Sequence, residues 1–86
     1  MRKIRSSRSF GKDFKKAELS TALVEILYLL AKGEPLPEKY RDHALTGNLK
    51  GFRDCHVKPD LVLIYKLLDD DVLELHQLGS HSEIFG

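Results

Sequence analysis

The segment Leu61–Leu68 constrains the fold of this chain more than any other part of the sequence. It reads Leu-Val-Leu-Ile-Tyr-Lys-Leu-Leu, so it is apolar on both faces of an extended strand except at Lys66. A strand that is half exposed alternates between apolar and polar residues, whereas a strand buried on both faces does not. The segment is therefore predicted to be the central strand of a sheet.

Strands are also predicted on both sides of this segment. Residues 51–57 form one strand, which turns at Lys58-Pro59-Asp60, and residues 72–78 form another after the turn of three aspartates at 69–71. Such short connections join antiparallel neighbours. A further short strand is expected near residues 43–46. Ser80 to Glu83 match the Ser-x-x-Glu capping box, which predicts a single helical turn there. Alternation along residues 51–57 divides the side chains into Phe52, Asp54 and His56 on one face and Arg53, Cys55 and Val57 on the other.

The chain begins with a predicted edge strand and a helix. Residues 2–7 read Arg-Lys-Ile-Arg-Ser-Ser, with Ile4 expected to face inward and the basic residues protecting the edge. Ser7 or Ser9 is expected to cap the helix that follows. The apolar residues at helical spacing in that helix are Phe10, Phe14 and Ala17.

A second helix is predicted from about Leu19 or Ser20 to Lys32, ending at Gly33. Its main apolar face comprises Leu19, Leu23, Ile26, Leu27 and Leu30, and it is widened by Val24, Tyr28 and Leu29. Two interpretations remain open: either the helices bury the whole width against the sheet, or part of it is a groove for a partner helix.

These elements predict an α+β domain, in which two N-terminal helices cover one face of an antiparallel sheet of four to five strands. With 86 residues the chain is expected to be one domain, 1–86, which excludes a multi-domain enzyme or a TIM barrel. Its single cysteine, Cys55, cannot form an intrachain disulfide and fits a reducing cytosol. Neither a signal peptide nor a membrane span is evident, so a cytoplasmic location is expected.

The formal net charge of +1 conceals basic and acidic segments. Residues 1–16 contain seven basic residues against one acidic residue, and residues 39–58 contain five against two. This pattern indicates a polyanion partner such as RNA, although charges separated in sequence can also average out over a folded surface.

The side chains best suited to catalysis are histidines and an aspartate near the predicted turns. They lack the paired spacing of small zinc sites, and the chain has no phosphate-binding loop or hydrolase motif. Imidazoles alone can exchange the protons needed to cleave RNA, where a 2′-hydroxyl attacks the adjacent phosphorus and the 5′-oxygen leaves. Lys50 and Arg53 are candidates for stabilising the phosphorane charge, although Arg53 shares its strand face with core residues. Any one histidine taken alone is more often a surface or capping residue, and His76 is expected to be such a case.

Several motifs together resemble the YafQ branch of the RelE/ParE toxin superfamily. They are Leu36-Pro37, Tyr40-Arg41-Asp42-His43-Ala44-Leu45, Gly47, Lys50 to Asp60, Leu63-Ile64-Tyr65-Lys66 and the C-terminal Gly79-Ser80-His81-Ser82-Glu83-Ile84-Phe85-Gly86. The similarity is dense from Leu36 to Lys66 and at the C-terminus, and weaker over the first 30 residues. It implies the RelE-like microbial RNase fold.

The resemblance also implies a function: a type II toxin that cleaves mRNA on the ribosome without a metal or cofactor. A DinJ-like antitoxin would neutralise it, and operator DNA would be contacted only through that complex. The implied catalytic residues are His43, His56, Asp60 and His81, and Phe85 would contact a base. His81 is expected to be the general acid, and the general base stays open among His43, His56 and Asp60.

Two features separate this chain from the family pattern. Leu61 stands where a tryptophan is expected, which leaves codon preference open, and the N-terminal helices diverge, so antitoxin specificity does not carry over. The alternative function is that of the ParE-like relatives, which inhibit gyrase by binding and cleave no RNA. A third possibility is an inactive member that only pairs with an antitoxin.

Overall fold

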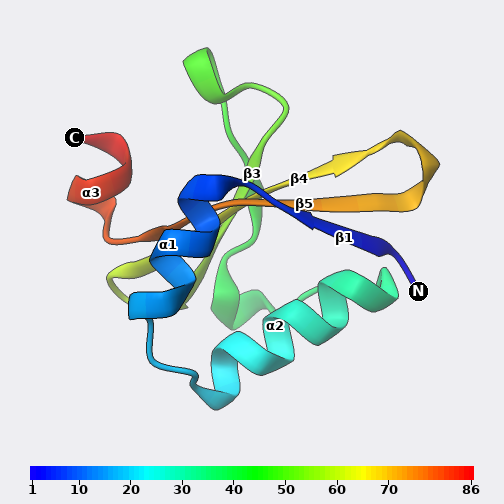
Figure 1. Ribbon diagram of the computed structural model, residues 1–86, viewed down its shortest axis with the longest axis horizontal. Coiled ribbons are helices and arrows are strands. Elements are labelled where there is room, and N and C mark those ends of the chain that lie inside the picture. The colour runs from blue at the N-terminus through cyan, green and yellow to red at the C-terminus, as the bar shows by residue number, and fades with distance from the viewer.

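The computed structural model describes residues 1–86 and consists of three α-helices and a five-stranded sheet (Figure 1). The strands are β1 (Lys3–Ser6), β2 (His43–Ala44), β3 (Arg53–Lys58), β4 (Leu61–Leu68) and β5 (Val72–Gly79). The helices are α1 (Arg8–Lys16), α2 (Thr21–Lys32) and α3 (His81–Phe85), with 3-10 turns η1 (Glu38–Tyr40), η2 (Gly47–Leu49) and η3 (Asp69–Asp71).

The sheet has the strand order β1-β5-β4-β3-β2, which places β4 at its centre as predicted. Antiparallel pairing joins β2 to β3, β3 to β4 and β4 to β5, since tight turns connect the last three strands. The edge strand β1 differs from the all-antiparallel expectation, because it pairs in parallel with β5, with Lys3 opposite Val72. No tight turn links these two strands: α1, α2 and the other three strands lie between them in the chain, and so long a connection permits the parallel direction.

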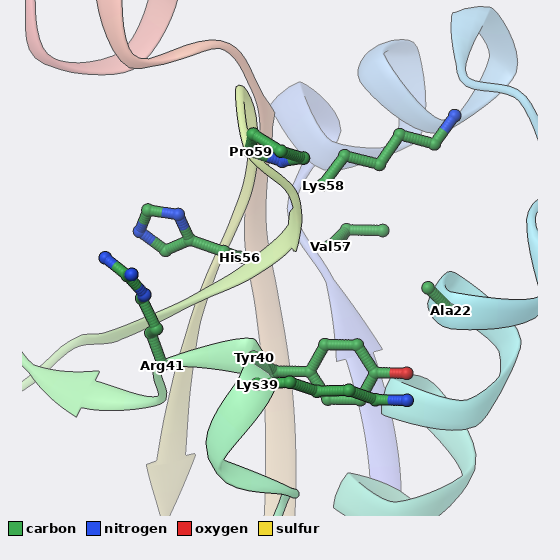
Figure 2. A pocket seen from close by; sticks show the side chains of 8 residues that line it. All are labelled: Ala22, Lys39, Tyr40, Arg41, His56, Val57, Lys58 and Pro59. Carbon is green, nitrogen blue, oxygen red and sulfur yellow. The ribbon is translucent and has the colours of Figure 1, made fainter.

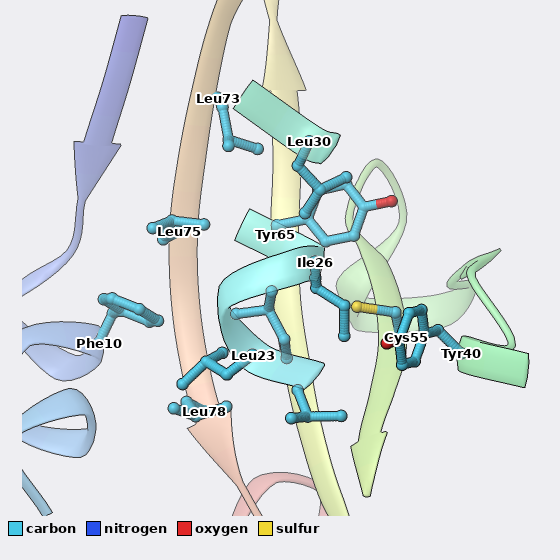
Figure 3. Packing of buried hydrophobic residues seen from close by; sticks show 12 residues of the cluster. Phe10, Leu23, Ile26, Leu30, Tyr40, Cys55, Tyr65, Leu73, Leu75 and Leu78 are labelled. Carbon is cyan, nitrogen blue, oxygen red and sulfur yellow. The ribbon is translucent and has the colours of Figure 1, made fainter. Parts of the chain in front are cut away.

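The core lies between the sheet and the two N-terminal helices. Leu23, Ile26 and Leu30 of α2 are buried in one cluster with residues of the sheet, including Cys55 and Tyr65 (Figure 3). Phe10 of α1 joins the same cluster beside β5. Full burial of one such side chain stabilises the fold by roughly 1.5–3 kcal/mol. The predicted placement of both helices on one face of the sheet is confirmed.

A serine caps the N-terminus of each of the two helices, and the cap of α1 is one of the two serines predicted for it. Ser7 is the N-cap of α1, where its Oγ accepts a hydrogen bond from the amide of Phe10 at 3.0 Å. Ser20 is the N-cap of α2, where its Oγ accepts from the amide of Leu23 at 3.2 Å. Gly33 ends α2 with a φ of 80°, a left-handed conformation that favours glycine.

Two expectations about apolar side chains are wrong. Ile4 shares the sheet face of its pairing partner Leu73 but is not buried there: it is 54% exposed, because β1 is an edge strand whose four residues are all exposed. Leu19 does not belong to the apolar face of α2, because it precedes the N-cap and is exposed. Val24 and Tyr28 are also exposed, so the widened face of α2 is only partly buried. None of the helices is long and apolar enough to cross a membrane.

Candidate active site

The candidate site lies on the sheet face opposite α1 and α2. Alternation along β3 directs Cys55 and Val57 into the helix-covered core, as predicted, and therefore directs Asp54 and His56 to the other face. Val62 and Ile64 of β4 pair with His56 and Asp54 respectively and are fully buried on that face. This second face of the sheet is therefore also packed, and the buried Val62 and Ile64 side chains lie beside His56 and Asp54.

His56 and His81 form the centre of this site. Their ring centroids are 5.2 Å apart, although the two residues are 25 positions apart in the sequence. Asp60, at the turn between β3 and β4, has its Oδ1 atom 3.6 Å from Nδ1 of His81, and the same oxygen accepts a hydrogen bond from the His81 amide at 3.3 Å. The Phe85 ring lies 5.7 Å from the His81 ring and is 45% exposed. The structure therefore brings together four of the predicted site residues.

A capping box holds α3, and therefore His81, in this position. Ser80 Oγ accepts a hydrogen bond from the Glu83 amide, and Glu83 Oε1 accepts one from the Ser80 amide at 2.8 Å. These hydrogen bonds lower the pKa of Glu83, and the nearby charge of Lys16 lowers it further. The predicted capping box is thus confirmed, and it fixes a helix of five residues that would not be stable alone.

His43 reaches the same sheet face from the neighbouring strand. It pairs with Asp54 across β2 and β3, and its Nδ1 atom lies 3.1 Å from Asp54 Oδ1 and 2.8 Å from the Arg41 carbonyl oxygen. Both contacts are made by Nδ1, so the Nε2 atom of this half-exposed ring remains free of them. This arrangement leaves one imidazole nitrogen available for proton exchange.

Asp54 is a site residue that the sequence prediction did not include. Its side chain is 4% exposed, and its Oδ1 atom accepts no hydrogen bond. Burial raises the pKa of this carboxyl, while the positive charges that His43, His56 and His81 can carry lower it. These three histidines are the ones predicted for the site, and Asp54 is close enough to each of them for their charges to act on it. Strand alternation with His56 is the signal that identifies it.

Lys50 and Arg53 lie in different surroundings. Lys50 is exposed in the loop between η2 and β3. Arg53 is on the helix side of the sheet, where its Nε and Nη2 atoms each lie 3.3 Å from a carboxylate oxygen of Asp42. Tyr65 also donates a hydrogen bond to Asp42. The period of a strand places Arg53 on the opposite face from His56, and the geometry does not support Arg53 as a substrate contact.

A basic pocket adjoins the histidines at the β3 edge of the sheet, with a volume of about 520 Å³. Figure 2 shows Arg41 and His56 extending to one side of it and the amino ends of Lys39 and Lys58 to the other. Its other lining residues are Ala22, Tyr40, Val57 and Pro59. The three cations of this pocket belong to the basic segment 39–58, but the sequence alone did not single them out.

The remaining polar groups do not extend the site. His76 packs against the Phe52 ring at a centroid distance of 4.6 Å, and Lys66 lies over the same ring at 5.0 Å. His76 is thus a packing residue, as expected. The structure brings no three His, Cys, Asp or Glu side chains together as a group that could hold a metal ion.

These observations define a class of protein: a small α+β domain that carries an exposed cluster of imidazole and carboxylate groups beside a basic pocket. The family model for YafQ, a bacterial toxin of type II toxin–antitoxin systems, matches residues 2–86. The chain belongs to this family, which confirms the resemblance seen in the sequence.

Individual relatives cover the whole chain. The mRNA interferase toxin YafQ of Escherichia coli strain K12 is 41% identical over 90 residues, which span 99% of this chain and 97% of the relative. A copper-bound mutant toxin from Helicobacter pylori superposes with a TM-score of 0.90 at 47% identity, covering 99% of this chain and 100% of that one. The toxin in the E. coli DinJ–YafQ complex superposes with a TM-score of 0.85 at 40% identity, covering all of both chains. The α+β fold with a RelE-like arrangement is therefore confirmed.

Proposed function

We propose that this toxin is an endoribonuclease that cleaves mRNA on the ribosome and that a DinJ-like antitoxin neutralises it. The observation that carries the proposal is the 5.2 Å approach of the His56 and His81 rings, with Asp60 in contact with His81. Two adjacent imidazoles on an exposed face can act on one phosphodiester group placed over them. The E. coli relative named an mRNA interferase supports the same reaction.

His81 is the proposed general acid. Asp60 lies on the Nδ1 side of its ring and leaves Nε2 free to deliver a proton to the departing 5′-oxygen. Because the ring is about half exposed, a substrate can reach it from solvent. Phe85, beside the His81 ring, offers an aromatic face on which an mRNA base can stack.

The general base is one of the other three groups, and the geometry is compatible with each. His56 is the nearest imidazole to His81, His43 has a free Nε2 atom, and Asp60 is an exposed carboxylate. Removal of the 2′-hydroxyl proton generates the nucleophile, which attacks the adjacent phosphorus and displaces the 5′-oxygen. Lys50 is the proposed cation for the charge that develops on the phosphorane oxygens.

The reaction is proposed to need no metal. Imidazole groups can carry out both proton transfers, which is why no further catalyst is required in this scheme. A solved relative from H. pylori is described as copper-bound, so the point has to be tested directly. The test is cleavage after the toxin alone has been treated with a strong chelator and the chelator has been removed, where the rate on ribosome-bound mRNA should be unchanged.

The antitoxin is proposed to bind along α1 and α2. The exposed Val24 and Tyr28 extend the buried face of α2 to the surface, and a segment of antitoxin that folds on binding would cover them. The E. coli complex in which YafQ is bound to DinJ supports a partner of this type. Contact with operator DNA would occur through the antitoxin in such a complex.

Primer extension on ribosome-bound mRNA tests the proposed activity. The wild-type protein should cut the message and arrest growth when it is expressed without an antitoxin, and His81→Ala should abolish both effects. His76→Ala is the matched control, because His76 packs on Phe52 and lies outside the proposed machinery. Cleavage that survives His81→Ala would contradict the catalytic assignment. Intact mRNA together with blocked DNA supercoiling would instead indicate a ParE-like gyrase inhibitor.

A further inference from the structure

The basic pocket at the β3 edge has properties that proton transfer does not require. It is lined by Lys39, Arg41 and Lys58, and no carboxylate is among its lining residues. Lys39 and Arg41 form no ion pair, and Lys58 forms one with Glu18, whose side chain is 83% exposed. An exposed ion pair of this kind is worth less than about 1 kcal/mol and is readily exchanged for another anion. The pocket therefore concentrates positive charge that no group of the protein neutralises strongly.

The local fold creates this pocket. Strand β2 pairs only with Arg53 and Asp54, so the rest of β3 lies at the edge of the sheet. The 3-10 turn η1 and the left-handed residue Arg41, with a φ of 51°, carry the chain past this edge. The edge strand is thus left open between η1 and the β3–β4 turn, with the three cations around the opening.

Two residues join the pocket to the candidate active site. His56 lines the pocket and at the same time faces the His81 ring at 5.2 Å. Arg41 lines the pocket, and its side chain extends to the same side as His56 (Figure 2). Its carbonyl oxygen lies 2.8 Å from Nδ1 of His43. A polyanion held by the pocket would therefore continue directly over the histidines.

We propose that this pocket is a subsite for the RNA backbone, in which Arg41 on the His56 side and Lys39 and Lys58 on the other side hold the phosphates next to the scissile one. The inference rests on the proposed endonuclease function. Phosphate contacts position a nucleic acid without reading its sequence, which suits an opening lined by flexible ammonium groups and one guanidinium. The exposed Pro59 ring at the opening offers an apolar surface for the sugar or base of the same nucleotide. An acidic antitoxin segment is the competing occupant, and RNA is favoured because His56 forms part of the wall.

The test measures binding of an RNA hexamer that is 2′-O-methylated throughout and cannot be cleaved. Fluorescence anisotropy would compare the wild type with the double variant Lys39→Gln/Lys58→Gln. Removal of each charge-assisted hydrogen bond to phosphate weakens binding by roughly tenfold. The slope of log Kd against log salt concentration should fall by about 0.7 for each phosphate that is no longer neutralised. Lys3→Gln is the matched control, because β1 lies at the opposite edge of the sheet.

The outcomes separate this subsite from the proposed function. Unchanged hexamer affinity and salt slope in the double variant, with wild-type cleavage of mRNA intact, would overturn the subsite alone. If the double variant bound the hexamer weakly as expected but the wild type cut no ribosome-bound mRNA, the subsite would stand and the endonuclease would be overturned. If the double variant failed to bind the antitoxin while keeping the hexamer affinity, the pocket would belong to the antitoxin and the proposal would be wrong. Circular dichroism would establish that each variant is folded.

Discussion

The Nδ1 atom of His43 lies 3.1 Å from the Oδ1 atom of the buried Asp54. On the opposite sheet face, the chain neighbours of these two residues, Asp42 and Arg53, form an ion pair of their own at 3.3 Å. In the first pair the carboxylate is on β3, whereas in the second pair the carboxylate, Asp42, precedes β2 and the cation is on β3. The short pairing of β2 with β3, which positions His43, is therefore flanked by an oppositely charged pair on each face of the sheet.

Replacing Asp54 should separate stability from activity. Because burial raises the pKa of Asp54, its charged form destabilises the fold, and this loss sets in as the pH rises through that raised pKa. Asp54→Asn is therefore expected to raise the melting temperature at neutral pH. Cleavage should fall by about tenfold or more, because His43 loses its charged neighbour. Calorimetry would measure the melting temperature, and a cleavage assay would measure the activity. Unchanged cleavage by Asp54→Asn would show that Asp54 is not part of the active site.

The Asp42 network should be a stability element rather than a substrate contact. Tyr65 is 1% exposed, and its hydroxyl group donates to Asp42. Asp42→Ala would leave this buried hydroxyl and Arg53 without their acceptor, at a cost of about 2 kcal/mol. Urea unfolding of Asp42→Ala, Tyr65→Phe and the double variant would give the coupling energy of the pair. Additive effects would show that the two side chains do not act together.

The C-terminal helix should loosen in acid. The hydrogen bonds of the capping box lower the pKa of Glu83, so their contribution is present above the ordinary glutamate pKa and is lost as the pH falls through the lowered one. The amide resonance of Ser80 should move in that pH range, and the His81 amide should exchange faster. Glu83→Gln keeps an acceptor oxygen and should remove most of the pH dependence. If the chemical shift of the Ser80 amide stayed constant as the pH fell through the pKa of Glu83, the capping box would not be formed in solution.

Antitoxin binding should protect one contiguous part of the chain. Backbone amides within residues 8–32 are expected to exchange more slowly in the complex, because the exposed Val24 and Tyr28 become covered. Tyr28→Asp should weaken the complex without unfolding the toxin, since this side chain is 53% exposed. Hydrogen exchange with mass spectrometry would locate the protection. Its absence from α1 and α2 would exclude this surface as the antitoxin site.

Cys55 should be inert in the folded protein. The side chain is fully buried, and burial raises the pKa of its thiol to about 12. A thiol-specific reagent at pH 8 should therefore label Cys55 only after unfolding, so the labelling rate reports opening of the core. Labelling as fast as that of free cysteine would show that the β3 core face is accessible.

The sequence alone determined the elements whose signals are local. The apolar run of β4, the serine cap of α1 and the Ser80–Glu83 capping box all depend on residues within a few positions of one another, and all are present as predicted. Alternation along β3 also separated Cys55 and Val57 from His56 correctly. Such short-range patterns follow from the period of a strand or helix, which is visible in the order of the residues.

Only the tertiary structure decided which side chains meet. The approach of His56 to His81 and the pairing of His43 with Asp54 depend on strand register and on where α3 returns to the sheet. The parallel direction of β1 and the exposure of Ile4 likewise depend on the place of β1 as an edge strand of the sheet. The basic pocket arises because β2 is shorter than β3, a difference between two strands that no single segment encodes. Local patterns fix the elements, and packing of those elements fixes the site.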